Sequence, residues 1–386
     1  MHRQRLAGKS VVLLTDAGGM GGTRTYLDRL LRYYASRQVS GTLVDGSSRL
    51  DAAVRKVAVE SGFRVVAYED VVSKGNGSRK RALDRLKPGF LGDASEKEAF
   101  NDLGILGPRD LVVASVGRPG AFLSATAGAT RSLYFLHTYP HGWKHRLLGR
   151  RIMPGLVSDT TTIVTGSKFA ARRVADQWGL DARMGQIRTI PYTVGQVPNR
   201  EVSRPPLRLV LTVAQVEPYK GPREWVGAAE IALSKPGMDD VQFVWVGDGS
   251  LIDECRAAVS TELRGRIQFV GFMEDVAPYF AAATVYLQLS TVENLSLSVL
   301  DALRYGLPTI LTRVGGMPEQ TIDGVSGILV APGDVQGAAD ATVWMLSSDD
   351  RVANMSEGAR NLYLTRFGPQ VWEQHMDLLH AEALAS

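Results

Sequence analysis

Short apolar runs that alternate with longer helical patterns constrain the fold of this chain more than any other feature. In the first half the runs are 11–15, 42–44, 65–68, 111–115, 133–136 and 162–165. In the second half they are 207–213, 241–246, 267–270, 286–289, 309–312 and 328–330. Such alternation is typical of βα units around a parallel sheet. We therefore predict an α/β protein with two doubly wound, Rossmann-type sheets.

A polar, proline-rich segment at 197–206 separates the two series of runs, as expected of a linker. The 386 residues suffice for two domains with separate cores. We place the first domain at 1–198 and the second at 199–366, with a ligand cleft between them. The remaining residues, 367–386, carry the pattern of an amphipathic helix.

The composition is that of a soluble globular protein, with 45% apolar and 22% charged residues. A formal net charge of +4 gives no argument for nucleic-acid binding. The one cysteine, Cys255, rules out an internal disulfide framework and fits a reducing compartment. The first apolar run is too short for a signal peptide or a membrane span. These features predict a cytoplasmic protein.

Two acidic residues lie in the loop and the helix of one strand-loop-helix-strand unit, 284–312. Glu293 lies in the polar turn, and Asp301 lies inside a short amphipathic helix that ends at Gly306. Helix geometry separates the two acids by roughly 9 to 12 Å, with the free N–H groups of the first helical turn between them. Those N–H groups can bind an anion, and acids beside them can bind hydroxyls. The arrangement suits a diphosphate with a sugar at each end. Alternatively, Glu293 is an acid favoured by the helix dipole and Asp301 is a solvated helix residue.

Three histidines, His137, His141 and His145, follow one another at intervals of four. Pro140 and Gly142 break any helix there, and no Cys or acid completes a ligand set, so we predict no metal site. His137 ends an apolar strand, where α/β proteins place functional loops. The alternative for His137 is a core or capping role.

The run from Ser290 to Glu319 resembles the E-x7-E segment of the retaining GT-B glycosyltransferases of family 4. Further matches to this family are Lys220-Gly221, 246–249, 270–273, 314–319 and 327–334. The resemblance is strong from about 207 to 334 and weak before it. It implies a GT-B-like fold in which the first domain lies on the acceptor side, the second binds the nucleotide sugar, and the tail packs back on the first.

The resemblance assigns roles to the acids and to the helix start between them. Glu293 would contact the donor sugar, Asp301 would bind the ribose, and the backbone of Leu297 and Ser298 would hold the diphosphate. The sequence departs from the family where Asp301 replaces a Glu and Ser296 replaces a common Gly. The side chain of Asp is one methylene shorter than that of Glu, so Asp301 reaches less far toward the ribose.

The resemblance also assigns the groups around the leaving diphosphate and the base. Lys220 would neutralise the diphosphate, although a lysine before glycine is equally compatible with an exposed loop. Gln215 stands where the family has an arginine, which weakens this stabilisation or moves part of it to another cation such as Arg24. The backbone near Phe272 and Met273 would meet the base.

In the first domain, the resemblance points to the glycine-rich loop after the first strand. Gly21 and Gly22 match a Gly-Gly pair that lies near the donor phosphate and the acceptor; the alternative is a simple tight turn. Thr23 and Arg24 would face the same cleft on the acceptor side. His137 would lie near the donor's anomeric carbon.

We therefore predict a retaining hexosyltransferase that needs no cofactor or metal. It would move a sugar from a UDP- or GDP-sugar to a hydroxyl of a glycan, lipid-linked or small-molecule acceptor in glycan or glycolipid biosynthesis. The alternatives are a sugar-nucleotide epimerase on the same fold and a sugar-nucleotide-binding protein without turnover. A two-lobed periplasmic binding protein is opposed by the missing signal peptide.

The segment 141–153 interleaves one Trp and several aliphatic residues with Lys144, Arg146, Arg150 and Arg151. Basic residues near an anionic leaflet contribute about 1 kcal/mol each, so this segment predicts reversible binding to an anionic membrane surface. The alternative is an ordinary surface helix that packs on its own domain. A second basic segment, 73–82, is either a solvated surface or a loop at the acceptor or membrane side.

Overall fold

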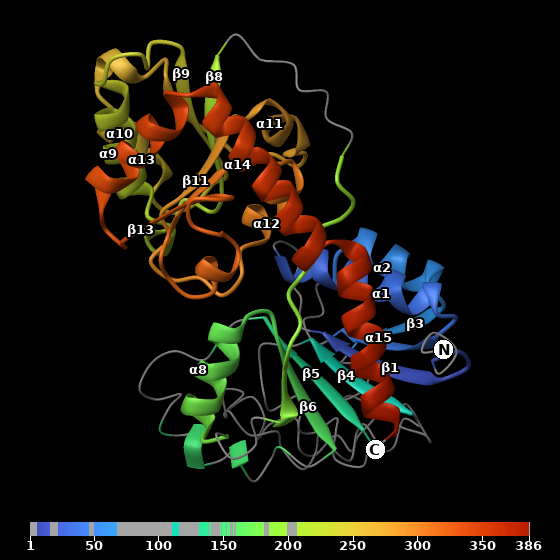
Figure 1. The fold of residues 1–386 in the computed structure, drawn as a ribbon. Coiled ribbons are helices and arrows are strands. Elements are labelled where there is room, and N and C mark those ends of the chain that lie inside the picture. Colours follow the sequence, from blue (N-terminus) through green and yellow to red (C-terminus); the bar gives the residue numbers. More distant parts are fainter. Residues whose placement is uncertain are drawn as a thin grey trace, which may run out of the picture. The chain divides into compact units, whose positions relative to one another are not determined.

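The computed structural model divides the chain into two compact units. The described residues are 6–15, 22–45, 50–67, 110–115, 131–137, 160–180, 185–198 and 207–385, with short pieces between 139 and 157. Unit 1 consists of Met1–Ile190 and Glu373–Ser386, and unit 2 is Pro191–Trp372. Each unit is an α/β fold built on one parallel sheet (Figure 1).

The sheet of unit 1 has seven parallel strands in the order β3-β2-β1-β4-β5-β6-β7. The strands are β1 (Ser10–Thr15), β2 (Ser40–Asp45), β3 (Phe63–Ala67), β4 (Leu111–Ser115), β5 (Ser132–Leu136), β6 (Thr161–Thr165) and β7 (Ile187–Thr189). Its named helices are α1 (Gly22–Ser36), α2 (Ala52–Glu60), α8 (Lys168–Trp178) and most of α15 (Pro369–Ala385). The central strands β4 and β5 are buried along their whole length, as expected of a parallel sheet covered on both faces.

Helix α15 packs against the end of α1 through buried polar contacts. Arg37 is almost fully buried and pairs with Asp377 at 3.1 Å and with Glu373 at 3.0 Å. Beside this ion pair, the Tyr34 hydroxyl lies 2.9 Å from Nε2 of His380, and both side chains are fully buried. Burial lowers the pKa of His380 to about 4, so its imidazole is neutral near pH 7. The C-terminal helix is thereby part of unit 1.

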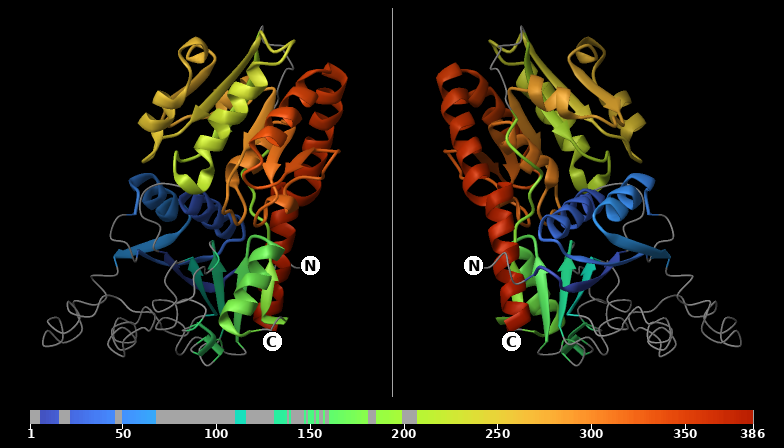
Figure 2. Two further views of the ribbon diagram at one scale, coloured as in Figure 1. Left: turned by 90° about the vertical axis from the view of Figure 1, so that its left-hand side faces the viewer. Right: turned by 90° about the vertical axis from the view of Figure 1, so that its right-hand side faces the viewer.

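The sheet of unit 2 has six parallel strands in the order β10-β9-β8-β11-β12-β13. The strands are β8 (Arg208–Val213), β9 (Val241–Val246), β10 (Ile267–Gly271), β11 (Val285–Gln288), β12 (Thr309–Thr312) and β13 (Gly327–Val330). The helices are α9 (Pro222–Leu233), α10 (Ile252–Ala258), α11 (Ala277–Ala282), α12 (Leu297–Arg304), α13 (Val335–Leu346) and α14 (Asp349–Leu362). They cover both faces of the sheet (Figure 2).

In both sheets the strands run outward from a central strand in one direction and then resume on its other side. The order reverses between β1 and β4 in unit 1 and between β8 and β11 in unit 2. This is the doubly wound topology, and it confirms the predicted fold of two Rossmann-like α/β halves. The short strand β7 was not among the predicted runs.

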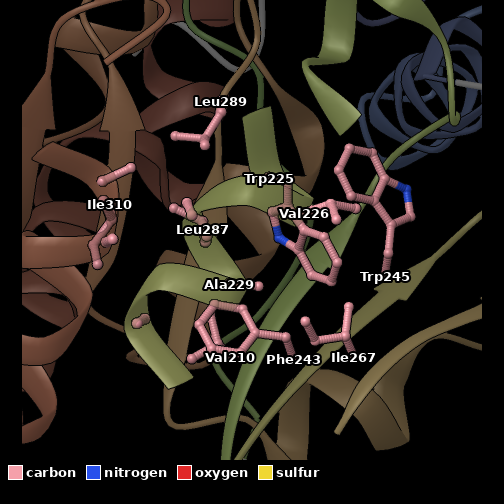
Figure 3. Packing of buried hydrophobic residues seen from close by; sticks show 14 of the residues in the cluster. Val210, Trp225, Val226, Ala229, Phe243, Trp245, Ile267, Leu287, Leu289 and Ile310 are labelled. Atoms are coloured by element: carbon pink, nitrogen blue, oxygen red, sulfur yellow. The ribbon is translucent and has the colours of Figure 1, made fainter. Parts of the chain in front are cut away.

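Aromatic side chains lie among the aliphatic residues of the hydrophobic core of unit 2 (Figure 3). The ring of Trp225 on α9 lies edge-on to Trp245 at 5.4 Å and to Phe243 at 5.8 Å between centroids. Burying each large aromatic side chain contributes about 1.5–3 kcal/mol or more. The indole N–H of Trp245 donates to the carbonyl of Ala214 at 2.8 Å. The core therefore anchors the loop that follows β8.

Within the part of the chain that the structure describes, no helix combines the length and the apolar character needed to span a bilayer.

Candidate functional site

Two loops of unit 2 leave the sheet where its strand order reverses. One follows β8 and contains the short helix η3 (Pro218–Lys220), and the other follows β11 and leads into α12. Doubly wound sheets bind ligands outside the carboxyl ends of the strands at this point. The predicted site residues Lys220 and Glu293 lie on these two loops.

Lys220 and Glu293 form a partly buried ion pair. Nζ of Lys220 lies 2.5 Å from Oε2 of Glu293, and the two side chains are 15% and 13% exposed. The other carboxylate oxygen of Glu293 accepts from the backbone N–H of Asn294 at 3.3 Å. Because water reaches both groups only in part, their charges are weakly screened. A ligand that enters here meets one cation and one anion side by side.

The backbones of the two loops are held together next to this pair. The N–H of Thr291 donates to the carbonyl of Tyr219 at 2.8 Å. Gly221 has φ 68°, and a Cβ at this residue would overlap the carbonyl oxygen of Leu289. Only glycine combines this conformation with so close a backbone approach. Because Gly221 lets the two loops approach this closely, the preceding Lys220 can reach Glu293.

Helix α12 begins beside Glu293 with a side-chain cap and a bracing glutamine. Oγ of Ser296 accepts from the N–H of Val299 at 3.5 Å. The buried carboxamide of Gln320 accepts from the N–H of Ser296 and donates to its carbonyl, both at 2.8 Å. The N–H groups of Leu297 and Ser298, in the first turn, have no intrahelical acceptor, as at every helix start. They present the positive end of the helix dipole.

Asp301 lies one turn further along α12 and forms an ion pair with Arg304. Oδ1 of Asp301 is 2.6 Å from the guanidinium of Arg304. Arg304 also donates to the carbonyl of Gln196 at 3.4 Å. A ribose that binds Asp301 must therefore share this carboxylate with Arg304 or displace the guanidinium.

The remaining predicted donor-site residues of unit 2 also lie at carboxyl ends of strands. Gln215 is exposed after β8, and its Oε1 accepts from the Tyr219 hydroxyl at 2.8 Å. Phe272 follows β10 with 59% of its surface exposed, and Met273 is half-buried. The exposed ring of Phe272 offers a flat apolar surface at this edge of the sheet.

In unit 1, His137 follows β5 and contacts the end of β4. Its Nε2 lies 2.7 Å from Oγ of Ser115, and its ring lies edge-on to Tyr26 with centroids 4.8 Å apart. Burial lowers the pKa of His137 to about 4, so the imidazole is neutral near pH 7. Arg24 lies in the first turn of α1 and pairs with Asp51 at 3.2 Å.

Several predicted residues fall outside the described part of the chain. Gly21, His141, His145 and the side chain of Thr23 are among them, while Gly22 is the first residue of α1. Among the residues that are described, no cluster of three or more His, Cys, Asp or Glu is placed to hold a metal ion.

Two functional candidates, Gln288 and Gln320, were not predicted from the sequence. Both side chains are fully buried, and both contact the loop that carries Glu293 and the start of α12. A polar residue at the end of an apolar strand run is the signal that indicates Gln288, because buried polar groups need partners.

The family model that matches this chain covers the part of unit 2 that contains these site residues. Residues 208–348 match the family model for glycosyl transferases group 1. The chain is 33% identical over 129 residues to N-acetyl-alpha-D-glucosaminyl L-malate synthase of Bacillus anthracis, covering 33% of this chain and 34% of that protein. It is 28% identical over 158 residues to UDP-Gal:alpha-D-GlcNAc-diphosphoundecaprenol alpha-1,3-galactosyltransferase of Escherichia coli, covering 40% of each. The matches span 34% and 40% of the length of these two curated relatives.

Among solved structures, the fold is similar to that of Anabaena Alr3699/HepE in complex with UDP and glucose. The TM-score is 0.76 with 17% identity, and the match covers 97% of this chain and 99% of that one. This likeness confirms that the two Rossmann-like halves form a GT-B fold.

We predict that Gly315→Ala destabilises unit 2 much more than Gly324→Ala. Both glycines have positive φ, 56° and 77°, so both variants lose about 1–2 kcal/mol to the left-handed conformation. A Cβ at Gly315 would also overlap the carbonyl oxygen of Glu293, whereas a Cβ at Gly324 meets open space. Overpacking adds about 1–3 kcal/mol for Gly315→Ala. Denaturant unfolding measures the free energy of unfolding of the two variants. Equal losses would contradict the close approach of Gly315 to the backbone of Glu293.

Proposed function

We propose that this protein is a retaining glycosyltransferase that moves a hexose-type sugar from a nucleoside diphosphate sugar to a hydroxyl acceptor. The observation that carries the proposal is the Lys220–Glu293 pair at the strand-order reversal of unit 2, beside the start of α12. The family model matched by residues 208–348 supports the same activity.

The donor diphosphate would bind the first-turn N–H groups of α12 and the ammonium of Lys220. A helix start and a lysine both favour the negative charge that grows on the diphosphate as it leaves. Lys220 would turn from Glu293 to the phosphate, and the released carboxylate would accept hydrogen bonds from the sugar hydroxyls. Asp301 would accept from the ribose, with Arg304 as the competing partner.

In the reaction, the bond from the anomeric carbon to the diphosphate oxygen breaks and a bond to the acceptor oxygen forms. The electron pair leaves with the diphosphate, and the acceptor's proton passes to a donor phosphate oxygen. Attack from the face that the diphosphate leaves would retain the anomeric configuration. No carboxylate acts as a nucleophile and no metal is required.

For the acceptor side we propose residues of unit 1. The neutral imidazole of His137 is suited to hydrogen-bond a sugar hydroxyl without adding charge. Arg24 would attract an acidic group of donor or acceptor, and Gly21, Gly22 and Thr23 are proposed for the same acceptor side.

The donor is proposed to be a UDP-sugar. UDP is bound in the similar Anabaena structure, and the E. coli relative is named for a UDP-Gal donor. A panel of UDP- and GDP-sugars separates this activity from its alternatives. Slow donor hydrolysis supports a transferase, an isomerised donor supports an epimerase, and saturable binding with neither supports a binding protein.

The acceptor is proposed to be a glycan presented on an amphiphile at an anionic membrane surface. The E. coli relative is named for a diphosphoundecaprenol-linked sugar. In the described part of 141–153, Leu147 is 67% exposed, whereas Met153 is buried and Arg150 pairs with Asp176. The exposed side chain suits a surface contact, and the other two anchor the segment to unit 1.

Sedimentation with liposomes tests the membrane surface. We expect salt-sensitive binding to anionic vesicles and none to neutral vesicles, because basic residues near an anionic surface contribute about 1 kcal/mol each. A variant with Lys144, Arg146 and Arg151 changed to Glu should lose this binding; Arg150 is kept, because it pairs with Asp176. If that variant binds as well as the wild type, this segment is not the membrane contact.

We predict that Glu293→Gln and Lys220→Ala each lower turnover by about ten- to a thousandfold, since each removes a charge at the reacting centre or the leaving group. Both variants should fold, because loop residues contribute little packing. Arg223 and Glu254 form an exposed ion pair in the same unit, at 2.5 Å, and provide the control. Arg223→Ala and Glu254→Gln should keep near wild-type rates. Near wild-type rates for Glu293→Gln and Lys220→Ala would refute the site.

A further inference from the structure

Gln288, the last residue of β11, is a fully buried amide with every hydrogen-bonding position used. Its Nε2 donates to Oγ of Ser290 at 2.9 Å and to Oε2 of Glu293 at 3.1 Å. Its Oε1 lies 3.0 Å from the hydroxyl of Tyr286 and accepts from Oγ of Ser296 at 3.1 Å. A carboxamide has two donors and two acceptor positions, so none is left over.

These partners determine which way the amide faces. The carboxylate of Glu293 accepts hydrogen bonds and cannot donate them when ionised, so it must face the NH2 group of Gln288. The oxygen of Gln288 then faces Ser296, the cap of α12. One side chain therefore contacts both the acid and the helix start of the proposed donor site.

Oε2 of Glu293 is shared between Gln288 and Lys220. The ammonium lies 2.5 Å from this oxygen and the amide nitrogen lies 3.1 Å from it. In the proposed reaction Lys220 turns to the diphosphate, which removes one of the two partners of this oxygen. The amide of Gln288 is a neutral and fully buried donor, so its hydrogen bond to Glu293 stays in place when Lys220 moves to the phosphate.

We propose that Gln288 is a positioning residue, which keeps the Glu293 carboxylate in its orientation after Lys220 has moved to the donor diphosphate. This inference rests on the proposed glycosyltransferase function. A side chain held by a buried partner needs no reordering during the reaction, which is the general advantage of preorganised sites. Gln288 itself touches no substrate in this scheme and acts through Glu293.

The test is a double-mutant cycle between Gln288→Met and Glu293→Gln, measured on kcat with a saturating UDP-sugar. Met has nearly the size of Gln but makes none of the hydrogen bonds of its carboxamide. We expect Gln288→Met to lower kcat by about ten- to a hundredfold in the wild type and by less than about threefold in the Glu293→Gln background. This dependence on background distinguishes positioning of Glu293 from a general structural effect.

Gln320→Met is the matched control, because Gln320 is also a fully buried glutamine. Its carboxamide forms two hydrogen bonds of 2.8 Å with the backbone of Ser296, and none of its described hydrogen bonds is to Glu293. Its effect on kcat should therefore be the same factor in both backgrounds. Circular dichroism and thermal melts establish that each variant is folded. If Gln288→Met does not fold, Gln288→Glu replaces it, since it keeps an acceptor toward Ser296 and loses the donor to Glu293.

The outcomes separate the two proposals. Wild-type turnover with a Gln288 effect that disappears in Glu293→Gln supports the positioning role. Wild-type turnover with equal Gln288 factors in both backgrounds, or with no Gln288 effect, overturns this inference and leaves the glycosyltransferase standing. A wild-type protein that turns over no donor overturns both.

Discussion

The ion pair between Lys220 and Glu293 is the interaction on which the proposed chemistry depends. It joins the loops after β8 and β11, the two strands between which the sheet of unit 2 reverses its order. Glycines at 221 and 315 allow the backbones to approach closely enough for the pair to form. Topology, loop sterics and charge therefore converge at one place on the sheet. A nucleoside diphosphate sugar, with a charged centre and hydroxyls on both sides, matches that arrangement.

The Lys220–Glu293 pair is charged, whereas the glutamines around it are neutral. On the same loop as Lys220, the neutral Gln215 accepts a hydrogen bond from the Tyr219 hydroxyl. The buried amide of Gln288 donates to Glu293, and that of Gln320 bonds to the backbone of Ser296; both groups are uncharged. Lys220 is thus the cation closest to Glu293 among the described contacts, and the neutral groups set geometry. In this account, stabilisation of the leaving diphosphate depends strongly on one lysine and the start of α12.

Much of the fold and of the charged site was predictable from the sequence. Each predicted apolar run corresponds to a strand, because a strand buried on both faces must be apolar. The end of a strand indicated His137, the polar turn before a helix indicated Glu293, and the family resemblance indicated Lys220. The Asp301–Arg304 pair was also predictable, because residues three apart on a helix are neighbours. The partners of Gln288 and the contact of His137 with Ser115 were not predictable, because they depend on which strands and loops become neighbours. Tertiary contacts decide whether a buried polar side chain is satisfied.

The central claim is that Lys220 binds the diphosphate of a nucleotide ligand. Titration calorimetry of UDP and of UMP against the wild type and Lys220→Ala tests it most directly, because the two ligands differ only in the second phosphate. A charge-assisted hydrogen bond contributes about 1.5–3 kcal/mol, or roughly ten- to a hundredfold in affinity. The account predicts that the wild type prefers UDP to UMP by at least this factor and that Lys220→Ala lowers the preference by about this factor, leaving the part that the start of α12 contributes. An equal preference in both proteins would contradict it.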